Sequence, residues 1–147
     1  EGFIRTLADR LERGAIFLLD YGFGESEYYH PQRHMGTVMC HQGHLADSDP
    51  LVAVGLKDIT AHVNFTAMAL AAQDAGLEVL GYTTQAHFLI NCGMLQKMEQ
   101  LAQAQRSTAA KLIMEHEMGE LFKVLALAKG TVWDALGFVH GDRSHRL

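Results

Sequence analysis

Two glycines behind an apolar segment raise the question of whether this chain binds a nucleotide. Gly22 and Gly24 follow the apolar residues 15–19. A dinucleotide-binding loop would need a third glycine at position 27 and a helix that begins there, because the glycines let the backbone approach the pyrophosphate. Position 27 is Glu27 instead, and the Tyr-Tyr-His-Pro sequence behind it is not typical of an amphipathic helix. The spacing therefore argues against a phosphate-binding loop.

Asp20 and Tyr21 offer a different chemistry at the same place. Both directly follow the apolar segment, and ligands of open α/β sheets bind outside the carboxyl ends of the strands. The next stretch contains aromatic side chains, histidines and Arg33, and it could fold over a substrate. A polar strand end with a surface loop explains the same residues, so both interpretations stay open. Gln85 follows a second expected strand, where its amide could hydrogen-bond to a substrate or a cofactor.

A group of histidines with one cysteine suggests zinc as a rival interpretation. Residues 30–44 contain His30, His34, Cys40, His41 and His44. A structural zinc site takes four nitrogen or sulfur ligands. The spacing of His41 and His44 would place both rings on one side only in a helix, and the Met-Gly-Thr-Val nearby is unfavourable for a helix. No C-x-x-C accompanies them, so we expect no metal site.

The elements that would position these residues alternate between helix and strand. Apolar spacing predicts helices at 1–13, 58–76 and 95–116, strands at 15–19, 77–83 and 122–128, a helical turn at 88–92, and a short strand at 36–41 within an irregular stretch at 22–57. Asp58 would be the N-cap of the second helix. The continuous apolar run at 15–19 is typical of a strand buried on both faces. The order predicts an α/β fold whose sheet is incomplete, because an unpaired central strand would be a pairing hazard.

The composition limits the class of protein. The chain has 147 residues, of which 48% are hydrophobic and 20% charged, as expected for one globular domain. Its net charge of −5 argues against a nucleic-acid-binding protein, and no apolar run is long enough for a membrane span. Two cysteines do not make a disulfide framework. The chain begins with Glu1 rather than Met, which together with the incomplete sheet suggests a portion of a larger domain.

The chain contains several specific stretches in a fixed order: GAIFLLDYGFGESEYY, RHMGT, GLKDITAHVNFTAMALAAQDAG, GYTTQAHFLINCG, and GELFKVLALAKG with GFVHGDR. Together they resemble the C-terminal part of the MidA-like family of class I S-adenosylmethionine-dependent methyltransferases, over nearly the whole chain. Mitochondrial members of that family act in the assembly of respiratory complex I and methylate an arginine of a core subunit. Their glycine-rich cofactor loop lies in the N-terminal half, which nothing here matches.

The resemblance implies a Rossmann-like methyltransferase sheet of which residues 1–147 supply the C-terminal half, with about three strands and flanking helices. The strand at 15–19 would be the fifth, the strand at 77–83 the sixth, and the strand at 122–128 the seventh, inserted antiparallel. Residues behind 15–19 would then lie on the substrate side. The chain departs from the family at Asn64, where members usually carry Asp. It also departs at Val38, Met39, Gln42 and Gly43, where it lacks arginines that could contact an anion or an acidic partner.

Within this family picture we expect Asp20 and Tyr21 to be catalytic. The Asp20 carboxylate would orient a substrate guanidinium through paired hydrogen bonds, and Tyr21 would stack on the cation. We expect substrate contacts from Arg33, Asp58, Thr60, His62 and Gln85. Capping by Asp58, a structural His62, and an Arg33 that fixes its own loop are the alternatives.

These observations predict the substrate-side half of a protein arginine methyltransferase. S-adenosylmethionine would be the cofactor of the full-length protein; we expect none for this chain alone, and we expect the fragment to be inactive. Its partners would be a protein substrate, such as a complex I subunit, and the missing N-terminal half or a second copy at an exposed strand edge. We expect no nucleic-acid or membrane partner. The location would be cytoplasmic in a bacterium and mitochondrial in a eukaryote. The alternative is a non-catalytic assembly or binding module, stabilised by a metal in one version.

Overall fold

The computed structural model describes residues 1–43 and 45–147. The helices are α1 (Gly2–Arg10), α2 (Glu25–Tyr28), α3 (Phe65–Asp74), α4 (Gln85–Asn91), α5 (Met94–Glu99) and α6 (Gln103–Ala110), with the short helical turns η1 (Pro31–Arg33), η2 (Glu115–Gly119), η3 (Leu136–Phe138) and η4 (Ser144–Arg146). The strands are β1 (Gly14–Phe23), β2 (Met39–Gln42), β3 (Leu45–Asp47), β4 (Asp58–Thr60), β5 (Val63–Asn64), β6 (Glu78–Thr84) and β7 (Phe122–Lys129). The expected α/β class is confirmed. In the described part, no helix has both the length and the apolar character to cross a membrane.

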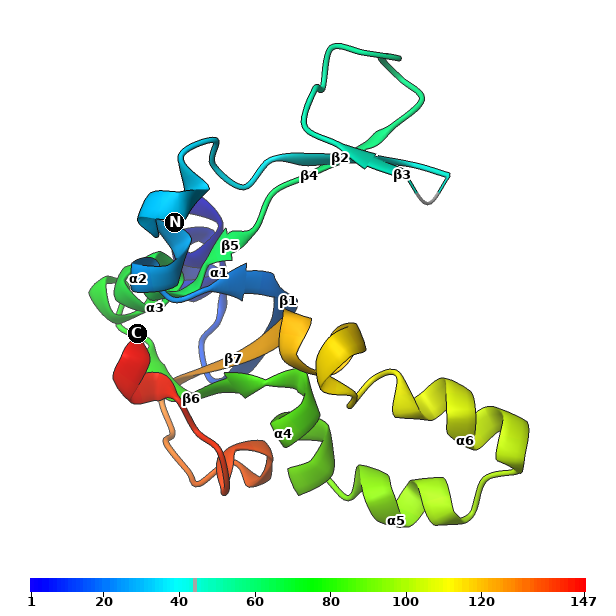
Figure 1. The fold of residues 1–147 in the computed structure, drawn as a ribbon. Helices are drawn as coiled ribbons and strands as arrows, with labels where there is room; N and C mark the ends of the chain where they lie inside the picture. Colours follow the sequence, from blue (N-terminus) through cyan, green and yellow to red (C-terminus); the bar gives the residue numbers. More distant parts are fainter. Residues whose placement is uncertain (44) are drawn as a thin grey trace.

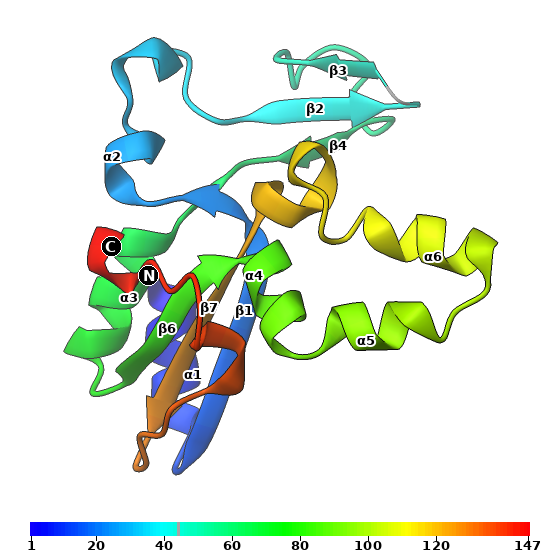
Figure 2. The same cartoon turned by 60° about the horizontal axis from the view of Figure 1, so that its bottom comes forward.

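The main sheet has four strands in the order β5-β1-β7-β6 (Figures 1 and 2). β7 is the last strand in the sequence but lies inside the sheet, antiparallel to both β1 and β6. The strand expected at 122–128 and its antiparallel insertion are therefore confirmed. β5 has two residues and pairs in parallel with Gly22 and Phe23 at the end of β1. No described strand pairs with the rest of that edge, residues 14–21, so the sheet is open there.

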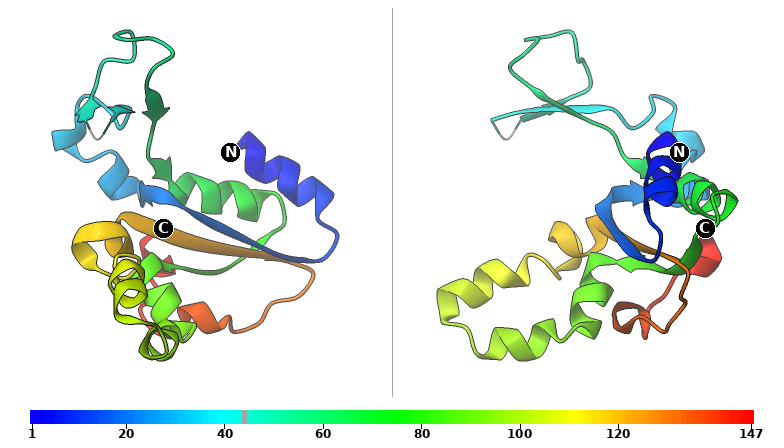
Figure 3. Two further views of the ribbon diagram at one scale, coloured as in Figure 1. Left: turned by 90° about the vertical axis from the view of Figure 1, so that its right-hand side faces the viewer. Right: turned by 180° about the vertical axis from the view of Figure 1, so that it is seen from behind.

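Helices cover both faces of the main sheet (Figure 3). α1 and α3 pack on one face, over a core that includes Phe65, Leu125 and Leu127. α4 and η3 pack on the other face, around Val124 and Ala126. Alternate residues of β7 are part of the two cores, because successive side chains of a strand point to opposite faces. The near-continuous apolar run of β7 follows from this burial on both sides.

Residues 39–43 and 45–60 form an arm that projects from the main sheet. Its three short strands pair antiparallel in the order β3-β2-β4. Figures 1 and 3 show the arm beyond the carboxyl end of β1, apart from the helical layers. Cys40 is buried, whereas Leu45, Leu51 and Ile59 are exposed. The strand expected at 36–41 thus exists, shifted to begin at Met39, and the stretch expected to be irregular holds a small sheet of its own.

The helix expected at 58–76 begins later, at Phe65, and Asp58 is not its N-cap. Asp58 and the two residues after it form β4, where the β-branched side chains at 59 and 60 suit a strand. Asn64 is the N-cap instead, and its side-chain oxygen accepts a hydrogen bond from the N–H of Ala67 at 3.1 Å. An Asp at position 64 would accept the same bond, which makes the departure from the resembled family conservative in this role.

The long helix expected at 95–116 is divided into α5, α6 and the π-helical turn η2. The backbone is extended at Ala102 (φ −63°, ψ 153°) and again at Met114 (φ −74°, ψ 135°). α5 and α6 form a hairpin that extends from the body, and neither helix has a buried residue (Figure 1). Tertiary packing therefore does not hold this segment straight. The break at Ala102 has no glycine or proline that would reveal it in the sequence.

The C-terminal segment lies along β6. The N–H of Tyr82 donates to the Asp142 carboxylate at 2.9 Å, and the N–H of Arg143 donates to the Tyr82 carbonyl at 2.6 Å. The Thr83 hydroxyl donates to the Gly141 carbonyl at 2.6 Å. The strand expected at 77–83 is confirmed as β6, and residues 141–143 hydrogen-bond to it.

Candidate functional site

Four rings meet where β1 ends, and we call them the ring cluster. Tyr21 and Phe23 belong to β1, Phe122 begins β7, and His62 lies between β4 and β5. The rings of Phe23 and His62 stack, with centroids 4.8 Å apart and planes inclined by 20°. Tyr21 meets His62 edge-on at 5.4 Å and Phe122 edge-on at 5.6 Å. The ring cluster therefore joins the main sheet to the base of the arm.

His62 contributes the imidazole of the ring cluster. Its backbone N–H donates to the Thr37 hydroxyl at 3.2 Å, which fixes it at the base of the arm. Its ring Nδ1 is buried and has no hydrogen-bond partner among the described residues. Burial is the main cause that lowers the pKa of His62, and the positive charges of Arg33 and Lys123 lower it further. The stacked imidazole is therefore favoured in its neutral form.

Arg33 lies over the ring of Phe23. The guanidinium carbon is 4.0 Å from the ring centroid, within the range of a cation–π contact. Its Nε donates to the Glu27 carbonyl at 2.9 Å. A pocket of about 440 Å³ adjoins it, lined by Glu27, His30, Gln32 and Arg33. Lys123 Nζ lies 6.0 Å from the same ring, so two positive groups gather around Phe23.

Asp20 lies on β1 beside the ring cluster. β1 continues to Phe23, so Asp20 and Tyr21 lie within the strand and not behind its end as the sequence suggested. Asp20 Oδ1 accepts a hydrogen bond from the N–H of Tyr21 at 2.8 Å, and the side chain is exposed. Its cross-strand neighbour is Lys123, which is buried on the same face of the sheet. The carboxylate is therefore available to a ligand at this end of the sheet.

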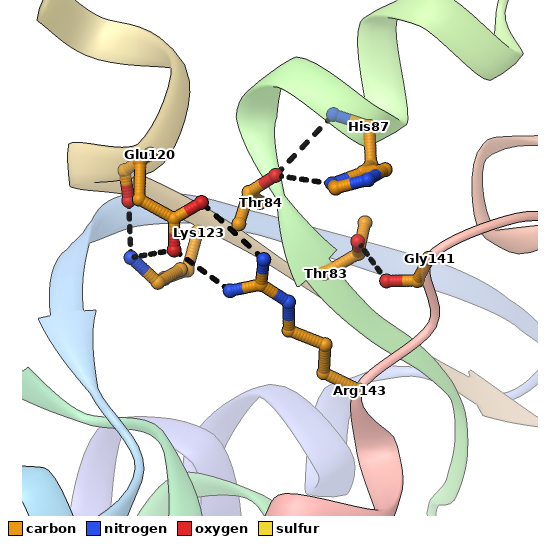
Figure 4. A network of polar contacts seen from close by, with 7 residues as sticks. All are labelled: Thr83, Thr84, His87, Glu120, Lys123, Gly141 and Arg143. Atoms are coloured by element: carbon orange, nitrogen blue, oxygen red, sulfur yellow. Dashed lines mark hydrogen bonds and ion pairs between the residues drawn. The ribbon is translucent and has the colours of Figure 1, made fainter. Parts of the chain in front are cut away.

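A polar network that includes Glu120, Lys123 and Arg143 is shown in Figure 4. It lies next to the ring cluster, because Lys123 Nζ is 6.0 Å from the centroid of the Phe23 ring. Both carboxylate oxygens of Glu120 accept hydrogen bonds from Arg143, at 2.7 and 3.4 Å. Lys123 donates to the Glu120 carbonyl, and burial lowers the pKa of its ammonium. Burial also raises the pKa of Tyr82 to about 12, and the Glu27 carboxylate adds to that shift. The network links the C-terminal segment to β7 next to Phe23.

Three predicted site residues lie elsewhere. Asp58 is exposed on β4 of the arm, and the Thr60 hydroxyl donates to the Met39 carbonyl at 3.1 Å, across the β2–β4 pair. Gln85 is buried at the start of α4, where its amide donates to the Leu112 carbonyl at 2.9 Å. Folding alone accounts for the contacts of Thr60 and Gln85. The structure brings the other four predicted residues together at the end of β1.

Close packing of the chain accounts for Gly22 and Gly24. A Cβ on Gly22 would lie 2.2 Å from the Val63 carbonyl oxygen, where β1 and β5 meet. A Cβ on Gly24 would lie 3.1 Å from the Arg146 carbonyl oxygen. The chain itself fills the space in front of both glycines. These residues therefore do not fit a cofactor cradle, in agreement with the missing third glycine.

The residues considered as zinc ligands have other surroundings. His30 Nδ1 accepts a hydrogen bond from the N–H of Gln32 at 3.3 Å, and Cys40 is a buried free thiol. His44 lies outside the described residues. Within residues 1–43 and 45–147, no group of three His, Cys, Asp or Glu side chains could hold a metal ion.

Sequence reasoning missed Phe23, Phe122 and Lys123. Phe23 stands between two glycines, and its only signal was that it shares a strand face with Tyr21. Phe122 and Lys123 begin a strand that was predicted, but only the register, with Tyr21 opposite Phe122, brings them to the site. Strand periodicity does not reveal that pairing.

Known proteins resemble this chain in sequence and in structure. Residues 1–83 match a family model described as "Putative S-adenosyl-L-methionine-dependent methyltransferase". A crystal structure from Burkholderia thailandensis, of a "likely methyl transferase" bound to S-adenosyl-homocysteine, matches 99% of this chain with 48% identity and a TM-score of 0.93. A native crystal structure of an uncharacterized protein of the same superfamily and organism matches 99% with 49% identity and a TM-score of 0.93. This chain spans 40% and 41% of those two chains. A comparison with curated proteins found no match.

The family match covers more than half of the chain, and the whole fold agrees with crystal structures that share nearly half of its residues. The chain thus belongs to this family of S-adenosyl-L-methionine-dependent methyltransferases.

Proposed function

We propose that this chain forms the substrate side of a methyltransferase whose methyl acceptor is an arginine side chain of a protein. The observation that carries the proposal is the ring cluster with the exposed Asp20 carboxylate, at the end of β1 in a chain of this family. The resemblance to the MidA-like family supports the choice of arginine, and by the same resemblance the acceptor protein would be a subunit of respiratory complex I.

The chemistry of this end of the sheet suits a guanidinium group. A guanidinium is planar, stacks on aromatic rings and donates parallel hydrogen bonds to a carboxylate. Phe23 already holds one guanidinium of the chain, that of Arg33, and the Glu120 carboxylate holds a second, that of Arg143. In this proposal Asp20 and Tyr21 orient the acceptor, while His62 keeps Phe23 in place through their stacked rings. Correct positioning of the reacting groups accounts for a large part of enzymatic rate enhancement.

The site of the methyl donor belongs, in this proposal, to a part of the protein outside these residues. Gly22 and Gly24 do not fit a cradle, and the crystal structure bound to S-adenosyl-homocysteine has a chain of which this one spans 40%. The chain is then the C-terminal half of a Rossmann-like sheet, and residues 1–147 alone transfer no methyl group.

The test is a methyl-transfer assay with the full-length protein, with mass spectrometry of the acceptor. We expect methylated arginine. Asp20→Asn should lower turnover about tenfold to a hundredfold through misplacement of the acceptor, with little change in the affinity for S-adenosylmethionine. Asp9→Asn, on the exposed surface of α1, is the matched control and should leave turnover unchanged. A methylated residue other than arginine would overturn the substrate assignment, and unchanged turnover in Asp20→Asn would remove Asp20 from the site.

A further inference from the structure

We propose that Arg33 occupies the position of the substrate guanidinium, and that the substrate binds by displacing Arg33 from the ring of Phe23. This inference rests on the proposed function, because it names what controls access to the same site. It makes Phe23 the platform for the acceptor and makes Arg33 an internal competitor.

The contact of Arg33 with Phe23 has the geometry expected for a bound substrate guanidinium. The guanidinium carbon lies 4.0 Å from the ring centroid. His62 stacks on the same ring at 4.8 Å, so the platform is held by a neighbour that does not move with Arg33. A ligand cation in place of Arg33 would therefore find the same aromatic ring, already held in position by His62.

The side chain of Arg33 makes fewer polar contacts than that of Arg143. Among the described residues, the Arg33 side chain forms one hydrogen bond, from Nε to the Glu27 carbonyl, and no carboxylate forms an ion pair with it. Arg143, in contrast, donates from two nitrogens to the Glu120 carboxylate and anchors the C-terminal segment. When the Arg33 guanidinium moves away from Phe23, it loses the cation–π contact and at most the one hydrogen bond from Nε.

The surroundings of Arg33 leave room for exchange. Arg33 ends the three-residue turn η1, which has no buried residue, and the pocket of about 440 Å³ lies beside it. His62 stacks on the Phe23 ring and the Arg33 guanidinium lies 4.0 Å over it, so the two faces of the ring are taken and a second guanidinium has no free face to bind. Substrate and Arg33 therefore exclude each other, one for one.

The experiment measures binding of N-acetyl-arginine amide to the full-length protein by calorimetry, so its readout does not need methyl transfer. Arg33→Ala should bind this probe about tenfold more tightly than the natural protein, because a cation–π contact of moderate strength no longer competes. Arg33→Gln keeps a donor for the Glu27 carbonyl without the charge and should behave in the same way. Arg5→Ala, which removes an exposed arginine of α1, is the control and should change nothing. Phe23→Leu should abolish binding with or without Arg33.

Each result decides one of two questions. Unchanged or weaker binding of the probe in both Arg33→Ala and Arg33→Gln would overturn the inference, as would equal strengthening for neutral N-acetyl-glutamine amide. If the natural protein methylates no arginine while Arg33→Ala still binds the probe more tightly, the proposed function fails and the competition stands. If it methylates arginine and the KM for the acceptor is the same in Arg33→Ala, the competition fails and the proposed function stands.

Discussion

His62 stacks on Phe23 with a ring nitrogen that has no partner in the described part of the chain. Because burial lowers the pKa of His62 from its ordinary value of 6.5, the folded chain binds this proton less readily than the unfolded chain. We therefore expect the free energy of unfolding to fall as the pH drops below about 6.5, until the lowered pKa is reached. Urea unfolding between pH 5 and 8 measures this, and His62→Phe should flatten that part of the profile. Identical profiles for the two proteins would contradict it.

Substitution of Gly22 tests whether this glycine is needed for backbone packing or for ligand binding. Gly22→Ala should lower the free energy of unfolding by about 1–3 kcal/mol with no ligand present, because its Cβ would overlap the Val63 carbonyl. Gly2→Ala is the control, since its Cβ would meet nothing within 4 Å, and we expect a change within about 0.5 kcal/mol. Denaturant unfolding of both variants gives the comparison. An unchanged free energy of unfolding in Gly22→Ala would contradict the packing explanation, and Gly22 would again be a candidate for ligand binding.

At the scale of elements, the start of α3 gives the sharpest test. Asn64→Ala should cost about 1 kcal/mol of unfolding free energy, because the N–H of Ala67 loses its capping acceptor. Asp58→Ala, at the position where the sequence predicted the cap, should stay within about 0.5 kcal/mol. Denaturant midpoints of the two variants measure the difference. A larger loss for Asp58→Ala would contradict the observed helix boundary.

The same scale shows what sequence patterns can and cannot predict. The apolar runs of β1, β6 and β7 were correctly predicted to be strands, and so was the helix from Phe65 onward, because burial leaves a regular spacing of apolar residues. The expectation that residues 15–19 are buried on both faces was wrong, because Phe17 and Leu19 are exposed on one face of β1. The break at Ala102 left none, because no residue there is a helix breaker. At the site, the chemistry of Asp20, Tyr21 and His62 was visible in the sequence. The role of Phe23 was not, because it depends on which side chains other elements place over its ring.

The molecule as a whole has an open sheet edge. Residues 14–21 of β1 have no described strand beside them on that side, and Phe17 and Leu19 nearby are 44% and 51% exposed. Open edges with apolar side chains pair with other chains. We expect residues 1–147, expressed alone, to self-associate, and Leu19→Lys to reduce this. Leu70→Lys, on the exposed side of α3, is the control. Light scattering measures the mass; a clean monomer would contradict the prediction.

The position of β7 has a consequence for how this chain is made. β1 and β6 have no hydrogen bonds to each other in the main sheet, and both depend on a strand that leaves the ribosome after them. Gly14 pairs with Lys129, which is synthesised much later, and pairing between residues so far apart in the sequence is slow. During translation both strands lack their β7 partner until residues 122–129 emerge. A stop codon before Phe122 would therefore remove the middle of the sheet, and would be far more damaging than the loss of a peripheral strand.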